Sequence, residues 1–211
     1  AGNDTYYVDN AGDVVIETLL NQGNDIVVSS LSYALAAGAY IEGLTLTGGE
    51  VSQQSEFAQE LLAGCRKEGI HTAMETCGLC EGERLRKLAD LCDLILFDLK
   101  LYDDDDHRRW TGASNRAILN NARRLSGRNI EARIPLIPGI TDTDKNLGAL
   151  IAFIRGAGIK RLSFLPFNPS TGAKYEWLGK TCEVSGEPQT QEMLDGWLRK
   201  ARHAGLEAAV A

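Results

Sequence analysis

Apolar residues recur at helical spacing in five stretches of this chain, and short apolar runs separate the stretches. The helical stretches span residues 57–65, 85–92, 118–125, 147–154 and 193–201. The apolar runs, typical of buried strands, span residues 44–47, 70–75, 94–97, 130–137, 161–167 and 206–210. Alternating strands and helices predict an α/β fold in which helices lie outside a parallel sheet. The number of strands favours an incomplete (β/α) barrel with parallel strands.

Glycine marks the ends of several predicted helices. Gly69, Gly158 and Gly205 each stand just after a helical stretch and just before or beside the next strand. A helix commonly ends on a residue in the left-handed conformation, which glycine adopts without a steric penalty. These positions therefore support the boundaries drawn from the apolar pattern.

Residues 1–43 have a different pattern, with much Gly, Asn and Asp and many β-branched residues. Gly2-Asn3-Asp4 and Gly23-Asn24-Asp25, 21 residues apart, each precede a short apolar run, at residues 5–8 and 26–28. We expect a turn and a short strand at each site, and hence a β-rich segment over 1–43 ahead of a barrel domain over 44–211.

Composition narrows the classes of partner. The chain is 44% hydrophobic and 24% charged, with 22 basic and 29 acidic residues and a net charge of −7. This excess of acidic residues argues against nucleic acid as a partner, and no apolar run is long enough to span a membrane. The five cysteines are scattered and odd in number, which favours reduced thiols and a cytoplasmic location.

Polar residues follow the predicted strands where each one ends. They are Gly48, Gly49, Glu50, Glu75, Thr76, Asp98, Lys100, Arg133 and Asn168. The period of two along a strand places Asp98 and Lys100 on one face, with Leu99 on the other. Because parallel barrel strands bring their carboxyl ends to one rim, we expect Glu50, Glu75, Asp98 and Lys100 around one cavity.

Several motifs occur together in the order typical of one family. They are Thr47-Gly48-Gly49-Glu50, the stretch 69–78 ending in Glu75-Thr76-Cys77-Gly78, Asp98-Leu99-Lys100, His107 with Thr111-Gly112-Ala113-Ser114-Asn115, Arg133 through Pro138-Gly139, and Leu165-Pro166-Phe167-Asn168 with the stretch 174–179. With these motifs, residues 44–211 resemble the radical S-adenosylmethionine (SAM) activating enzymes of glycyl radical enzymes, the pyruvate formate-lyase activase type.

The resemblance implies a cofactor, a partner and a role for each site residue. Gly48, Gly49 and Glu50 would hold the SAM amino group, and Lys100 would pair with its carboxylate. Glu75, Thr76 and Asp98 would line the same polar pocket, with Arg133 beside them and Asn168 in the place of a ribose-contacting residue. The partner would be a glycyl radical enzyme.

One signature of that family is missing from the sequence. The family holds a [4Fe–4S] cluster on three cysteines spaced Cys-x3-Cys-x2-Cys ahead of Gly-Gly-Glu, and no such motif occurs here. In its place stands a segment that resembles the flank of calcium-binding repeat proteins of the repeats-in-toxin type. We therefore expect an N-terminally truncated or fused activase, without the first barrel strand and inactive as written. The alternatives are an activase completed by another chain and a secreted calcium-binding repeat protein.

Two other groups of residues suggest metal sites but have simpler explanations. Cys77 and Cys80 form a Cys-x2-Cys pair, but Cys92 fits a helix core position, so three convergent ligands are lacking and we expect no metal site. Asp103 to Asp106 precede His107 and Trp110. Carboxylates are favourable at a helix N-terminus, so we expect them to cap a short helix.

Overall fold

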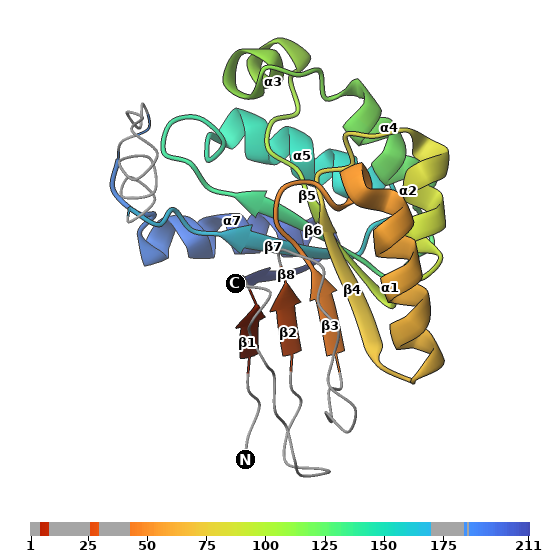
Figure 1. The fold of residues 1–211 in the computed structure, drawn as a ribbon. Coiled ribbons are helices and arrows are strands. Elements are labelled where there is room, and N and C mark those ends of the chain that lie inside the picture. Colours follow the sequence, from red (N-terminus) through yellow and green to blue (C-terminus); the bar gives the residue numbers. More distant parts are fainter. Residues whose placement is uncertain (1–4, 9–25, 30–42, 170–183, 185) are drawn as a thin grey trace. The chain divides into compact units, whose positions relative to one another are not determined.

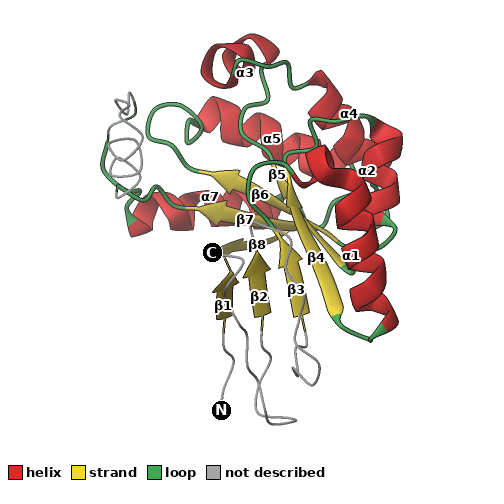
Figure 2. Cartoon of the chain, viewed as in Figure 1, coloured by secondary structure: helices red, strands yellow, loops and turns green. Residues whose placement is uncertain are grey.

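The computed structural model describes residues 5–8, 26–29, 43–169, 184 and 186–211 (Figure 1). The chain divides into two compact units, Ala1–Leu96 and Phe97–Ala211. In each unit the strands run parallel, and from β3 onward helices or turns connect one strand to the next (Figure 2). The predicted parallel α/β architecture is confirmed in both units.

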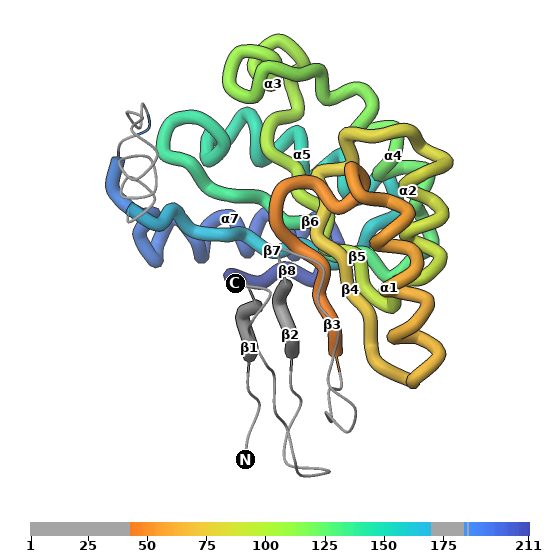
Figure 3. Tube along the Cα trace, in the orientation of Figure 1, coloured from red at the N-terminus to blue at the C-terminus, as the bar shows by residue number. Residues whose placement is uncertain are grey.

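The first unit contains four strands paired in chain order. They are β1 (Thr5–Val8), β2 (Ile26–Ser29), β3 (Gly43–Leu46) and β4 (His71–Thr76). The 3-10 helix η1 (Val51–Gln54) and helix α1 (Ser55–Lys67) connect β3 to β4, and α2 (Gly82–Ala89) follows β4. Helix α1 contacts both β4 and α2, and the path of the chain from β3 through α1 to β4 can be followed in Figure 3.

The two strands predicted in the N-terminal segment are present, although the Gly-Asn-Asp turns ahead of them lie outside the described residues. Strand β2 pairs in parallel with β3, with Ile26 opposite Gly43 and Ser29 opposite Leu46. The sequence predicts that residues 44–47 form an open edge unless residues 26–33 cover it, and β2 does cover it. Because β2 covers that side of β3, β3 is not an unpaired edge that would promote aggregation.

The second unit contains the other strands and helices of the described residues. Its elements are α3 (Asp104–Thr111), α4 (Arg116–Arg124), β6 (Ile130–Pro135), α5 (Asp144–Gly156), β7 (Arg161–Leu165), α7 (Gln191–His203) and β8 (Glu207–Val210). Strand β7 pairs in parallel with β6 on one side and with β8 on the other.

Strand β5 (Leu94–Asp98) carries the chain from the first unit into the second. Just before β5, the Asp93 amide donates at 2.8 Å to the carbonyl oxygen of Thr72, a residue of β4. Just after it, the Leu99 amide donates to the Arg133 carbonyl oxygen of β6 at 2.9 Å.

Strands β5 and β6 alternate between a buried face and a more accessible one. In β5, Ile95 and Phe97 are buried while Asp98 is partly accessible, and in β6, Ala132 and Ile134 are fully buried while Arg133 is not. Each large apolar side chain removed from water in this way contributes about 1.5–3 kcal/mol. In these two strands the accessible face thus carries Asp98 and Arg133, two residues of the predicted site.

The helix ends match the sequence signals closely. Gly69, Gly158 and Gly205 have φ of 75°, 74° and 86°, the left-handed conformation expected of glycine after a helix. The Asp103 carboxylate caps α3 by accepting from the amides of Asp105 and Asp106, as predicted. The expectation that Cys92 lies on the second helix is wrong, because α2 ends at Ala89 and Cys92 lies in the turn beyond it.

Across the described ranges, no helix has the length and apolar character needed to cross a bilayer.

Candidate functional site

Two reciprocal hydrogen bonds, each from a threonine hydroxyl to a glutamate carboxylate, join the carboxyl ends of β3 and β4 in the first unit. The Thr47 hydroxyl donates to Glu75 Oε2 at 2.6 Å, and the Thr76 hydroxyl donates to Glu50 Oε1 at 2.6 Å. Each pair contains one residue from the loop after β3 and one from the end of β4. The Gly-Gly-Glu segment is thereby fastened to the neighbouring strand at both of its ends.

The Glu50 carboxylate accepts more than this one bond. Oε2 accepts from the Cys77 amide at 3.0 Å and from the Cys77 thiol at 3.1 Å, and Oε1 accepts from the Ser52 amide at 3.3 Å. Partial burial raises the pKa of Glu50, but the hydrogen bonds from Thr76, Cys77 and Ser52 together outweigh it and leave the pKa below its usual value. Glu50 is therefore ionised, and both of its oxygens already have donors from the protein.

The two glycines between these bonds are open to solvent. Gly48 and Gly49 have φ of 85° and 49°. Residues with a side chain adopt this left-handed conformation only at a cost in free energy. A Cβ at Gly49 would meet no atom within 4 Å. A cavity of about 390 Å³ lies over this segment, between the Leu46–Val51 chain and the α1 residues Phe57 and Ala58. The backbone here is exposed to a ligand at close range.

In the second unit, Asp98 and Arg133 form an ion pair across β5 and β6. Both Nε and Nη2 of Arg133 donate to Asp98 Oδ1, at 2.9 and 2.8 Å. Only 13% of the Arg133 side chain and 19% of the Asp98 side chain are exposed, so solvent screens this pair weakly. These two predicted site residues are brought together.

Lys100 lies on the same face as Asp98, since Leu99 and Leu101 are buried and Lys100 is not. Among the described residues, no carboxylate forms an ion pair with its ammonium group. Asn168 is exposed, three residues beyond β7. That Glu50, Glu75, Asp98 and Lys100 surround a single cavity stays a prediction, and the motif over 174–179 lies outside the described residues.

Comparison with known proteins identifies the family. The model of the radical SAM superfamily matches residues 26–151, more than half of the chain. The chain belongs to the radical SAM superfamily.

Several similar proteins are activating enzymes. The chain is 40% identical over 146 residues to the trans-4-hydroxy-L-proline dehydratase activating enzyme of Clostridioides difficile, covering 67% of this chain and 48% of that protein. It is 36% identical over 171 residues to the pyruvate formate-lyase 2-activating enzyme of Escherichia coli, covering 80% and 59%. The chain thus spans about half the length of these relatives.

A solved structure agrees with this similarity. A domain of pyruvate-formate lyase-activating enzyme from Bacteroides vulgatus superposes with a TM-score of 0.68 at 26% identity. The superposition covers 80% of this chain and 98% of that one.

The radical SAM family uses a [4Fe–4S] cluster, and we compared the described thiols, those of Cys65, Cys77, Cys80 and Cys92, with the needs of such a cluster. Among the described residues, no three His, Cys, Asp or Glu side chains are grouped as metal ligands. Cys77 instead donates to Glu50, and burial raises the pKa of Cys80, which disfavours the thiolate that binds iron.

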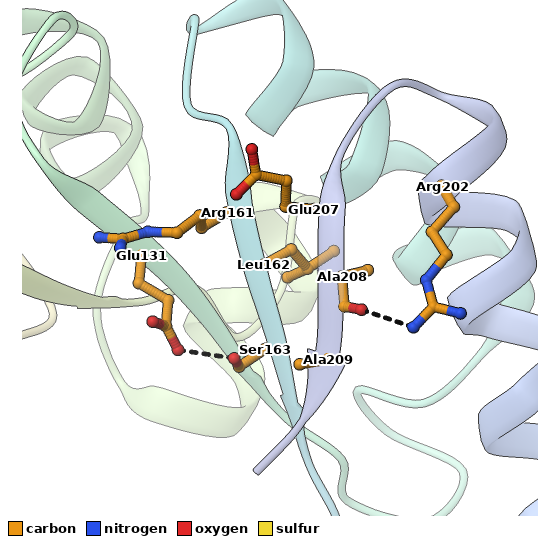
Figure 4. A pocket seen from close by; sticks show the side chains of 8 residues that line it. All are labelled: Glu131, Arg161, Leu162, Ser163, Arg202, Glu207, Ala208 and Ala209. Carbon is orange, nitrogen blue, oxygen red and sulfur yellow. Dashed lines mark hydrogen bonds between the residues drawn. The ribbon is translucent and has the colours of Figure 1, made fainter.

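A second cavity, of about 330 Å³, lies on β6, β7 and β8 (Figure 4). Its polar lining includes Glu131, which accepts from the Ser163 hydroxyl at 2.6 Å, and Arg202, which donates to the Ala208 carbonyl oxygen at 2.9 Å. Arg161 and Glu207 begin their strands, so this cavity lies toward the amino ends of the sheet. Barrel enzymes place their chemistry at the carboxyl ends, and we assign this cavity no function.

Proposed function

We propose that this chain is the SAM-binding part of a glycyl-radical enzyme activating enzyme. The relatives that support the proposal are activating enzymes, for trans-4-hydroxy-L-proline dehydratase, choline trimethylamine-lyase and pyruvate formate-lyase. On this proposal the partner is a glycyl radical enzyme. The described cysteines Cys65, Cys77, Cys80 and Cys92 are free, and we propose a cytoplasmic location, where thiols stay reduced.

The observation that carries the proposal is the open Gly48-Gly49 backbone held between two hydrogen-bonded pairs. Since the oxygens of Glu50 already accept from the protein, we assign the SAM amino group to backbone carbonyl oxygens of this segment. Glu50 then acts by holding the segment in place. This assignment keeps the cationic amino group beside an ionised carboxylate.

The other predicted residues have roles that follow from their chemistry. Lys100, which forms no ion pair with a described carboxylate, supplies a cation for the SAM carboxylate. Asp98 is neutralised by Arg133. We assign the polar lining of the same pocket to Glu75, which accepts from the Thr47 hydroxyl, and to Thr76. We assign Asn168 to contact the ribose of SAM.

The cluster ligands are the part of the site that this chain does not supply. The sequence contains no Cys-x3-Cys-x2-Cys motif. We therefore propose that the chain by itself binds SAM without cleaving it. A second candidate is an activase whose cluster thiolates come from another polypeptide, and assays of iron and sulfide bound after anaerobic reconstitution separate the two.

Titration with S-adenosylhomocysteine, a stable analogue with the same amino-acid group, tests the binding proposal. We expect saturable binding that Gly49→Ala weakens, because the added Cβ occupies the open space over the segment. The matched control is Gly127→Ala, since Gly127 is also exposed, has φ of 89° and has no atom within 4 Å of where a Cβ would lie. Equal affinities of the two variants and the wild type would refute the assignment.

A further inference from the structure

Beyond the end of β5, residues 99–102 belong to neither a helix nor a strand. Leu99 and Leu101 are 1% and 5% exposed, Lys100 is half-buried and Tyr102 is 40% exposed, so the side chains continue to alternate. Strand β6 supplies a partner for the Leu99 amide. The following residues need other partners, because buried backbone groups without hydrogen bonds are costly.

The side chain of Asn146 provides two of these partners. Its Nδ2 donates to the Lys100 carbonyl oxygen at 2.9 Å, and its Oδ1 accepts from the Tyr102 amide at 2.9 Å. A residue of a parallel strand bonds in this same way to two residues of its neighbour that stand two positions apart. The amide of Asn146 thus replaces a strand next to Lys100.

Asn146 is itself held firmly. It is 7% exposed, its second Nδ2 hydrogen donates to the Thr141 carbonyl oxygen at 2.8 Å, and its backbone amide donates to the Thr143 hydroxyl that caps α5. Both hydrogens of the side-chain amide are therefore in use.

Asn115 completes the arrangement from another element. It is 2% exposed, and its Nδ2 donates to the carbonyl oxygens of Leu101 and Tyr102 at 2.9 and 2.7 Å. Two buried amides from the starts of different helices thus satisfy three consecutive carbonyl groups, those of residues 100, 101 and 102.

We propose that Asn146 and Asn115 are positioning residues for Lys100. Lysine has a flexible stem, so the direction of its ammonium depends on how firmly its backbone is held. The two amides fix this backbone so that Lys100 is presented on the face of Asp98, toward an anionic group. The identity of that group as the carboxylate of SAM rests on the proposed function.

The test compares two ligands that differ in the amino-acid group. S-adenosylhomocysteine contains the carboxylate, and 5′-methylthioadenosine lacks it. We expect Asn146→Ala to weaken binding of S-adenosylhomocysteine about tenfold, the usual scale for a charged hydrogen bond, and to leave 5′-methylthioadenosine within about twofold of wild type. Asn120→Ala, at an exposed position of α4, is the control and should change neither.

A role in stability alone would weaken both ligands equally, and that result would overturn the proposal. Failure of the wild type to bind S-adenosylhomocysteine would contradict the proposed function instead. In that case, amide hydrogen exchange of the ligand-free protein tests whether Asn146 holds the backbone at Lys100. Asn146→Ala should speed exchange at residues 100–102 more than in β8, and equal or unchanged rates in both segments would overturn it.

Discussion

The Thr76 hydroxyl donates a 2.6 Å hydrogen bond to the Glu50 carboxylate, which lies 26 residues earlier in the chain. This bond connects the segment after β3 to the last residue of β4. Glu50 thus holds the segment in place, and the exposed backbone of Gly48 and Gly49 is left to bind a ligand.

Replacing this carboxylate tests how much it stabilises the fold. We expect Glu50→Gln to lower the free energy of unfolding by about 1–3 kcal/mol, because a charged acceptor of several bonds becomes neutral and loses one oxygen. Urea unfolding of the full chain measures the change. Glu60→Gln, on the exposed side of α1, is the control and should change it by less than about 0.5 kcal/mol. Equal effects of the two substitutions would contradict the structural role of Glu50.

The lowered pKa of Glu50 predicts how this contribution depends on pH. A carboxyl group whose pKa is lower when folded contributes fully above its unfolded pKa, about 4.3 for glutamate. The contribution is lost as the pH falls through the folded value. The difference in unfolding free energy between wild type and Glu50→Gln should therefore be constant near neutral pH and shrink under acid. If the difference in unfolding free energy grew on acidification, the pKa of Glu50 would be raised on folding and not lowered.

The ion pair of Asp98 and Arg133 should be measurable by a double-mutant cycle. Its side chains are mostly buried, so we expect a coupling energy of about 1–3 kcal/mol, above the value typical of exposed pairs. Unfolding of Asp98→Asn, Arg133→Gln and the double variant gives this energy. The exposed pair of Arg86 and Glu83 offers a matched cycle, for which we expect a clearly smaller coupling energy because solvent screens its charges. Similar energies for both pairs would contradict the account.

The order and boundaries of most elements could be predicted from the sequence because they depend on local signals. Glycines 69, 158 and 205 mark helix ends through their own backbone freedom, and Asp103 caps α3 through its own side chain. The alternation of burial likewise suffices to place Asp98 and Lys100 on one face.

What the sequence does not reveal depends on contacts between distant residues. Nothing in the local pattern indicates that Asn146 pairs with a segment 46 positions earlier, or that Cys77 donates to Glu50. Asn115 lies within a recognisable motif, but a single sequence cannot show that its amide is buried. The pairing of β2 with β3 is equally hidden, because short β-branched runs indicate strands without indicating their neighbours.

The missing cluster motif leads to a prediction about chemistry. After anaerobic reconstitution with iron, sulfide, reductant and SAM, we expect the chain to form no 5′-deoxyadenosine above background, because it lacks three suitably spaced thiolates. Chromatography of the quenched reaction measures the product. Formation of 5′-deoxyadenosine together with cluster absorbance, both abolished by Cys77→Ala, would show that Cys77 is a ligand after all.

Binding of S-adenosylhomocysteine by wild type and Lys100→Ala tests the central claim, that this chain recognises the amino-acid group of SAM with its own residues. Lys100 has no acidic partner among the described residues, so its removal should leave the fold intact and weaken binding about tenfold or more. The control is Lys145→Ala, at an exposed position of α5. We predict saturable calorimetric binding for wild type and Lys145→Ala, and a large loss for Lys100→Ala. Equal affinity in all three proteins, or no binding by any of them, would contradict the account.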